Sequence, residues 1–219
     1  MLNREKHRLL MFHILKDIFE SDIGKYLAFK WGTACYFFHN LDRFSTDLDF
    51  DLLEERDIDT ELENILKKYG NLKKWNKLVL SYGEEDINIK IDVTRKTWKS
   101  NSYEIRNFYG TDIRVQDKAT IFANKLVALT ERNTNRDIYD VCFFFQQSFD
   151  INEAIIQERT GKTLSLFLET VIQKIKSLPK NYNILDGLGE VLSEKQKYFV
   201  KQKLLWELLW YIEFKKDFS

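Results

Sequence analysis

Two stretches decide the fold of this chain: Phe29-Lys30-Trp31-Gly32-Thr33 and Thr46-Asp47-Leu48-Asp49-Phe50-Asp51-Leu52. The second alternates with a period of two, so its apolar side chains point to one face of a strand and its three aspartates to the other. Asp is depleted in strands, and same-face neighbours lie only ~6.6 Å apart, so the three anions repel one another unless a cation lies among them. The pattern therefore indicates a strand that holds a divalent cation.

An acidic pair alone is a weak signal. The chain has 34 Asp and Glu in 219 residues, and about five Asp/Glu-x-Asp/Glu pairs are expected by chance. A solvated edge strand is the alternative interpretation of residues 46–52. The half-buried alternation, shortly after a small-residue turn, favours the metal site.

Composition indicates a folded, globular protein. The chain is 44% hydrophobic and 15% aromatic, with one Pro and eight Gly, which suits a packed core without a flexible linker. No apolar run reaches the ~20 residues of a membrane span and the N-terminus has no signal-peptide cleavage site, so we expect a cytoplasmic protein. Cys35 and Cys142 lie in apolar helical stretches and are expected to be reduced core residues, and no CxxC supports a zinc site.

Charge is balanced overall but uneven along the chain. Residues 47–63 hold nine acidic side chains and one basic one, whereas residues 67–77 hold five lysines and no acid. Such runs are commonly solvated faces. The functional alternative is a track for a phosphate backbone that leads to an acidic, metal-holding centre.

Periodicity divides the chain into a mixed part and a helical part. Helices are expected at 4–20, 34–40 and 59–69, with Thr33 as a cap, and strands at 26–30, 46–52, 77–82, 87–94, 103–108 and 113–115, with a turn at 83–86. After Asp117 the pattern is helical only, at 118–131, 136–147, 151–158, 162–177 and 194–214. We predict an α+β fold, with an α/β part at 1–115 and a helical part at 116–219.

Two strands offer carboxylates that can converge. Asp47 and Asp49 on one strand and Asp92 on another all lie on the polar side of apolar-alternating segments. If the strands are neighbours, these acids suit Mg²⁺, which prefers oxygen ligands and completes its shell with water and substrate phosphates. Gly32 and Thr33, at the start of a helix, suit a phosphate because backbone N–H groups and the helix dipole favour an anion there.

The same residues resemble a known family. Gly32-Thr33 followed by Leu41-Asp42-Arg43-Phe44-Ser45-Thr46-Asp47-Leu48-Asp49-Phe50 resembles the signature of the AbiEii/AbiGii-type nucleotidyltransferase toxins, within the DNA-polymerase-β-like nucleotidyltransferase superfamily. Asn124-Lys125-Leu126-Val127-Ala128-Leu129 and Arg136-Asp137-Ile138-Tyr139-Asp140 resemble its downstream motif. The resemblance covers residues 29–145 and implies a nucleotidyltransferase-like mixed sheet with flanking helices.

The resemblance also implies an activity and a set of roles. The family moves a nucleotide from an NTP to an acceptor with Mg²⁺ or Mn²⁺, and tRNA ends or protein side chains are acceptors in related proteins. By position, the metal ligands would be Asp47, Asp49 and Asp92, the downstream acid Asp137, and the nucleotide-binding residues Lys30, Gly32, Thr33, Arg43, Ser45 and Lys125. Trp31 stands where the family's Lys-Gly-Gly-Thr pattern has its first Gly. From the residues alone, Lys125 also fits a surface lysine and Asp137 a charge at a helix start.

Three functions are compatible with these motifs. The leading one is a toxin that transfers a nucleotide to RNA, such as tRNA, and that an antitoxin restrains. A small-molecule nucleotidyltransferase of the antibiotic-modifying kind uses the same fold. A catalytically inactive module that binds a nucleotide or a partner is the third, and the retained, mutually repelling acids argue against it.

Overall fold

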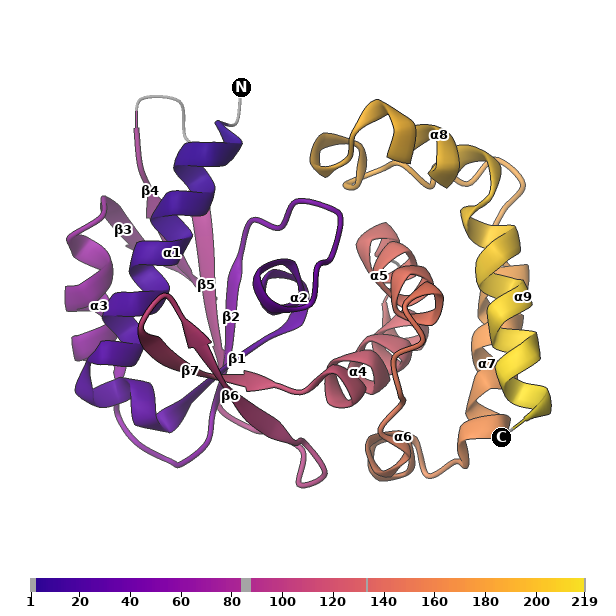
Figure 1. Cartoon of the computed structure of the whole chain (residues 1–219), viewed down its shortest axis with the longest axis horizontal. Coiled ribbons are helices and arrows are strands. Elements are labelled where there is room, and N and C mark those ends of the chain that lie inside the picture. Colours follow the sequence, from indigo (N-terminus) through magenta and orange to yellow (C-terminus); the bar gives the residue numbers. More distant parts are fainter. Residues whose placement is uncertain (1–2, 84–87, 133, 219) are drawn as a thin grey trace. The chain divides into compact units, whose positions relative to one another are not determined.

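The computed structural model describes residues 3–83, 88–132 and 134–218, and the chain forms two compact units (Figure 1). The first unit comprises Met1–Asn40, Phe44–Thr97 and Tyr103–Gln116, and the second comprises Leu41–Arg43, Trp98–Ser102 and Asp117–Ser219. Two short segments of the N-terminal half thus belong to the helical unit. The chain passes between the units at five points, the last between Gln116 and Asp117.

A mixed sheet forms the centre of the first unit. Within the described residues it has seven strands in the order β3-β4-β5-β2-β1-β7-β6. Their bounds are β1 Leu27–Lys30, β2 Leu48–Leu52, β3 Asn71–Lys74, β4 Leu78–Ser81, β5 Asn88–Thr94, β6 Tyr103–Phe108 and β7 Thr111–Gln116. Strand β2 pairs antiparallel with β1 and parallel with β5. The predicted α+β fold with a mixed sheet is confirmed, and so is the adjacency of the two acid-bearing strands.

Alternation along β1 and β2 gives the sheet one apolar and one polar face. Phe29 and Phe50 are Cα partners and both are fully buried. Phe19 of α1 (Arg4–Glu20) packs on Phe50, and Phe38 of α2 (Trp31–Phe38) packs on Phe29, with ring centroids 6.2 and 6.4 Å apart. Helix α3 (Asp59–Lys67) buries Leu62, Ile65 and Leu66. The carboxylates of β2 therefore point to the face opposite these phenylalanines.

The sequence-based elements differ from the structure at a few points. Strand β3 was not predicted, because three of its four residues are exposed and the segment lacks apolar alternation. Residues 84–86 of the predicted turn lie outside the described residues. The single helix expected at 194–214 is two, α8 (Glu194–Gln202) and α9 (Leu204–Asp217), because Lys203 leaves the helical conformation. No Pro or Gly marks this break.

The second unit is built from helices that bury one another. Its longer helices are α4 (Lys118–Glu131), α5 (Asn135–Gln146), α6 (Glu153–Thr160), α7 (Leu164–Lys176), α8 and α9. The Asp117 carboxylate caps α4 by accepting from the Thr120 amide at 2.7 Å. Cys142 lies buried in α5, and Cys35 lies buried in α2 of the first unit. Among the described residues, no helix is both long and apolar enough to cross a membrane.

Helix α9 has a buried and an exposed apolar face. Its buried side chains are Leu204, Leu208 and Ile212. Four aromatic side chains repeat every fourth residue on the other side and are 51–75% exposed: Trp206, Trp210, Phe214 and Phe218. The C-terminal helix therefore both contributes to the core and presents aromatic rings to solvent.

Candidate active site

Backbone pairing lines up two carboxylates on the polar face of the sheet. Asp49 of β2 and Asp92 of β5 are Cα partners in the parallel pairing, and Lys30 of β1 is the antiparallel partner of Asp49. Side chains of paired residues point to the same face of a sheet. Lys77, next to the pair formed by Leu78 and Ile91, places Nζ 2.6 Å from Asp92 Oδ2. Two acids thus lie in one row with a lysine on either side.

Burial and like charge make this row unfavourable for an ionised Asp49. The pKa of Asp49 is raised to about 6, first by burial and then by the charges of Asp47 and Asp92. The ammonium groups of Lys77 and Lys30 oppose this rise without cancelling it. A carboxylate that the protein itself leaves under-compensated is the kind of group that a divalent cation stabilises.

Asp47 lies just before β2 and is positioned by Thr33. The Thr33 hydroxyl donates a hydrogen bond to the Asp47 carbonyl and lies 2.7 Å from Ser45 Oγ. Thr33 lies inside α2, whose N-cap is Lys30, so the prediction that Thr33 caps this helix is wrong. The Thr33 and Ser45 side chains instead join the first turn of α2 to the loop that carries Asp47.

The turn between β1 and α2 has an unusual backbone. Trp31 has a φ of 66° and is followed by the buried residues Gly32 and Thr33 in the first turn of α2. This left-handed region costs a residue with a side chain roughly 1–2 kcal/mol and costs Gly little. The position at which the resembling family has Gly is therefore one at which the backbone favours Gly.

Lys30 has a buried carboxylate as its partner. Its Nζ lies 2.6 Å from Asp51 Oδ1 and 2.7 Å from Thr94 Oγ1. The other carboxylate oxygen of Asp51 accepts from Gln116 Nε2 at 2.6 Å and from the Tyr103 hydroxyl at 3.0 Å. Asp51, the third aspartate of the alternation, thus belongs to a buried hydrogen-bond cluster, and the charge of Lys30 also acts on Asp49.

His7 supports the segment that leads into β2. Its ring is buried, Nε2 lies 3.0 Å from the Thr46 carbonyl oxygen, and Nδ1 bonds the Tyr82 hydroxyl. A carbonyl only accepts, so Nε2 carries the proton and Nδ1 accepts from Tyr82. Sequence reasoning missed this role because the only signal is a lone His on a helix.

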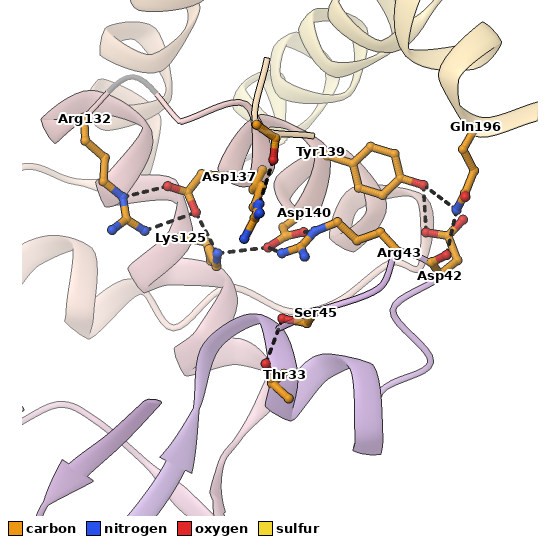
Figure 2. Close-up of polar contacts among 12 residues, drawn as sticks. Thr33, Asp42, Arg43, Ser45, Lys125, Arg132, Asp137, Tyr139, Asp140 and Gln196 are labelled. Atoms are coloured by element: carbon orange, nitrogen blue, oxygen red, sulfur yellow. Dashed lines mark hydrogen bonds and ion pairs between the residues drawn. The ribbon is translucent and has the colours of Figure 1, made fainter. Parts of the chain in front are cut away.

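A second polar cluster lies within the helical unit (Figure 2). Lys125 of α4 places Nζ 2.6 Å from Asp137 Oδ1 and 2.9 Å from Asp140 Oδ2, both on α5. Arg43 grips Asp140 with two hydrogen bonds, from Nε at 2.6 Å and from Nη2 at 2.7 Å. Arg132 donates from Nε to Asp137 Oδ2 at 2.7 Å. We name these five residues the α4–α5 charge cluster.

The α4–α5 charge cluster is buried and mutually compensated. Burial alone would raise the pKa of Asp140, but Arg43 and Lys125 outweigh it and lower that pKa. Burial would lower the pKa of Lys125, and the two carboxylates raise it instead. The sequence motif holds Asp140, and its spacing of three from Asp137 places both acids on one face of α5, a signal that could have selected it. Arg132 is the other member that sequence reasoning did not select.

The loop that carries Arg43 is fixed at a second point. The Tyr139 hydroxyl donates to Asp42 Oδ1 at 2.9 Å, and Gln196 Nε2 donates to the Asp42 carbonyl at 2.6 Å (Figure 2). The segment Leu41–Arg43 is therefore anchored to α5 and α8 of the helical unit.

The residues present fit a divalent cation as a pair of carboxylates with open positions. No group of three His, Cys, Asp or Glu side chains in the described part of the chain forms a ready cage for a metal. Mg²⁺ seldom uses such a cage: it takes one or two carboxylates and fills its octahedron with water and substrate phosphates. Asp49 with Asp47 or Asp92 matches that requirement, and the raised pKa of Asp49 shows that the site lacks positive charge.

Comparisons with known proteins agree with this geometry. The family described as "Nucleotidyl transferase AbiEii toxin, Type IV TA system" matches residues 13–198. The structure of JHP933 from Helicobacter pylori is similar with a TM-score of 0.67 at 20% identity, over 99% of this chain and 93% of that chain. MenT4, a nucleotidyltransferase toxin from Mycobacterium tuberculosis H37Rv, gives a TM-score of 0.59 at 18% identity, over 99% and 85%. These two show a shared fold, and no curated protein matches the sequence.

Proposed function

Because this chain belongs to the AbiEii nucleotidyltransferase toxin family, we propose that it transfers a nucleotide from a metal-bound NTP to an RNA acceptor at the carboxylates of β2 and β5. The family makes the chain a nucleotidyltransferase, and the predicted family is confirmed. The observation that carries the proposed site is the row in which Asp49 and Asp92 are Cα partners.

Asp47, Asp49 and Asp92 would hold Mg²⁺ or Mn²⁺, which supplies charge stabilisation for in-line attack at phosphorus. The acceptor hydroxyl forms a bond to the α-phosphorus, the bond from that phosphorus to the bridging oxygen breaks, and pyrophosphate leaves. Asp92 is the proposed acceptor of the hydroxyl proton. Lys77, its ion-pair partner, lies on the solvent side with its side chain 46% exposed.

The start of α2 is the proposed binding site for the triphosphate. Gly32 contributes an N–H group in the first helical turn, where the helix dipole favours an anion. Thr33 and Ser45 act by fixing the Asp47 loop. Lys30 adds positive charge next to Asp49.

Lys125, Asp137 and Arg43 remain proposed site residues of the helical unit. Lys125 is the proposed phosphate ligand, and Asp137 and Asp140 hold its ammonium group in place. Arg43 holds Asp140 in turn. Arg43 would thus act through this cluster and the loop that precedes Asp47.

The lysine run gives limited support to an RNA acceptor. Lys67 and Lys74 pair with Glu63, Lys68 pairs with Asp17, and Lys77 pairs with Asp92. Lys73 is exposed on β3, on the hairpin that contains Lys77. The run is therefore mainly a paired surface, and the RNA proposal rests on the family resemblance and on the position of this hairpin beside Asp92.

Each α-labelled NTP, incubated with the protein and Mg²⁺ in the presence of total RNA, a protein extract or an aminoglycoside panel, tests the proposal. We expect label on tRNA-sized RNA and none with Asp49→Asn. Label only on protein or on a drug would reject the RNA acceptor and keep the chemistry. No label on any acceptor would reject the transferase site.

The type IV toxin–antitoxin description of the family leads us to propose an antitoxin as a partner. Induced expression of the chain should arrest bacterial growth, and Asp49→Asn should not. Relief of the arrest by the product of the gene next to it would support the pairing. Growth arrest by the Asp49→Asn variant would contradict toxicity through nucleotide transfer.

A further inference from the structure

A cleft of about 130 Å³ opens at the sheet beside Asp92. It lies among α3, strand β5 and the connection from β3 to β4, all parts of the first unit. Its lining includes Leu62, Trp75, Lys77, Leu78, Asp92 and Arg95. An engineered apolar cavity of about 150 Å³ takes a benzene ring, so this cleft offers room for one aromatic ring.

The cleft exposes the backbone of a strand. Pairing of β4 with β5 extends to Leu78 and Ile91, whereas pairing of β2 with β5 continues to Asp51 and Thr94. Within the described sheet, β5 therefore has an open edge after Ile91, on the side that faced β4. The N–H and C=O groups on such an edge are available to a ligand.

Trp75 supplies a ring at the mouth of the cleft. Its side chain is 77% exposed although it lines the cleft, and its backbone N–H donates to the Lys77 carbonyl at 3.1 Å. An indole held on a hydrogen-bonded turn and left in water is a surface on which a flat ring can stack. Leu62 and Leu78 add apolar lining. A nucleobase uses all three features: a stacking ring, apolar contact and strand-edge hydrogen bonds.

Charge does not dominate the cleft. Its lining has three acidic and three basic side chains, and Lys77 with Asp92 and Arg95 with Asp59 form ion pairs. A bound group would be recognised through stacking and hydrogen bonds, and changes in salt should alter that recognition little.

The order of the strands assigns the cleft to the acceptor. The proposed triphosphate site follows β1, the acids lie on β2 and β5, and the cleft lies beyond β5, toward β4. In-line transfer places the attacking hydroxyl and the leaving pyrophosphate on opposite sides of the α-phosphorus. With the donor on the β1 side, the acceptor approaches from the β5 side, where Asp92 borders the cleft.

We propose that the terminal nucleobase of a single-stranded RNA acceptor binds in this cleft, stacked on Trp75, with its hydroxyl presented at Asp92. This assignment rests on the proposed nucleotidyl transfer and names a subsite for its acceptor. Bases at single-stranded ends are free to leave their own stack, which a base in the middle of a duplex is not.

Fluorescence anisotropy with a labelled, random-sequence single-stranded RNA octamer tests the subsite in the full chain with Mg²⁺. Trp75→Ala should weaken binding of the octamer by about 5- to 100-fold, as expected for loss of one stacked base. Trp75→Phe keeps a ring and should stay within about threefold of the parent. Trp206→Ala, at a tryptophan 69% exposed on α9, is the matched control and should bind as the parent does.

A second measurement separates failure of the subsite from failure of the proposed function. Affinity for Mg²⁺–NTP, measured by calorimetry, should be equal in the parent and the three variants. If Mg²⁺–NTP binds and Trp75→Ala retains the octamer affinity of the parent, or if Trp206→Ala loses as much, the subsite is wrong. Absent octamer binding by a parent that binds Mg²⁺–NTP also overturns it. A parent that binds no Mg²⁺–NTP overturns the proposed function itself.

Crosslinking gives the position directly. An octamer that ends in 5-iodouridine should crosslink on irradiation to Trp75, identified by mass spectrometry of the digested protein. A crosslink confined to α9 aromatic residues would place the RNA elsewhere and reject the cleft.

Discussion

Asp49 and Asp92 are Cα partners across the parallel pair of β2 and β5. Their separation is set by the sheet backbone, so it does not depend on other side chains. Asp47 lies before the first residue of β2, and its loop is held by the Thr33 hydroxyl. The proposed metal site therefore combines a rigid pair with a third acid that a hydrogen bond positions.

Asp49→Asn and Asp92→Asn should each abolish nucleotide transfer while the fold is retained. Each removes a charge from the proposed metal site, and the loss should exceed the roughly 10- to 100-fold typical of an outer-shell partner. Labelled transfer and circular dichroism, measured on the same preparations, check this. Asp150→Asn, an exposed acid between α5 and α6, should keep full activity. Full activity of Asp49→Asn would remove Asp49 from the site.

Asp49→Asn should also stabilise the metal-free protein at neutral pH. The folded-state pKa is raised from 3.8 to about 6, so the folded state binds more protons than the unfolded state between these values, and stability falls as pH rises through them. Asn cannot ionise. In EDTA the variant should match the parent near pH 4 and have a higher Tm above pH 6.

Added Mg²⁺ should reverse this order by raising the Tm of the parent more than that of the variant. Thermal unfolding from pH 4 to 8, with EDTA or Mg²⁺, decides the matter. A lower Tm for Asp49→Asn at pH 7 in EDTA would show that the carboxylate is well compensated without metal.

Arg43→Leu should destabilise the protein by about 3 kcal/mol. Asp140 is fully buried and would lose its bidentate partner, and such losses cost about 3–5 kcal/mol, the lower end applying because Lys125 remains. Urea unfolding measures the change. Arg8→Leu, at an exposed arginine on α1, should stay within about 0.5 kcal/mol.

The double variant Arg43→Leu/Asp140→Leu should lose less stability than the sum of the single variants, because the uncompensated charge is gone. Additive losses would show that the two groups do not interact in solution.

At position 31, Gly should be more stable than Ala. Both substitutions remove the Trp31 ring, but the φ of 66° costs Ala roughly 1–2 kcal/mol more than Gly. At Tyr36, inside α2, the order should reverse, with Ala better by about 1 kcal/mol. Unfolding free energies of the four variants test this. A Trp31→Ala protein more stable than Trp31→Gly would refute the left-handed turn.

His7→Gln should remove an acid sensitivity of the fold. Burial lowers the pKa of His7 below its ordinary 6.5, against the opposing effects of the Thr46 carbonyl and Asp47. The unfolded state therefore binds the proton more readily, and His7 costs stability as pH falls below about 6.5. The Asp49 shift has the opposite sign, so the informative quantity is parent minus variant.

That difference in unfolding free energy should fall between pH 7 and 5. His13→Gln, at an exposed histidine on the same helix, should leave the pH dependence unchanged. A pH-independent difference for His7→Gln would mean that His7 is not buried as a neutral base.

Much of this fold could be predicted from local patterns. Alternation over 46–52 and 87–94 identified β2 and β5 and put Asp49 and Asp92 on polar faces, and the two motifs identified the family. Pairing of β2 with β5 joins segments about 40 residues apart and was only a condition in that prediction. Nothing local in a strand states which strand will be its neighbour.

Side-chain partners were the least predictable part. Lys30 and Lys125 matched motif positions, yet only tertiary packing shows that their ammonium groups lie at 2.6 Å from the buried carboxylates of Asp51 and Asp137. The break at Lys203 was missed because the apolar period continues across it. The left-handed turn at Trp31 was visible only as a departure from a Gly, since the residue type itself argues against that conformation.

Arg43 belongs to the helical unit although 73 residues of chain separate it from Gln116. A fragment that starts at Asp117 would carry Asp140 without its arginine, and one that ends at Gln116 would carry that arginine without its acid. Evolution therefore could not exchange the helical part for another by a single recombination event. Any substitute must supply a seat for this loop, so the helical part and the short motif ahead of Asp47 are inherited together.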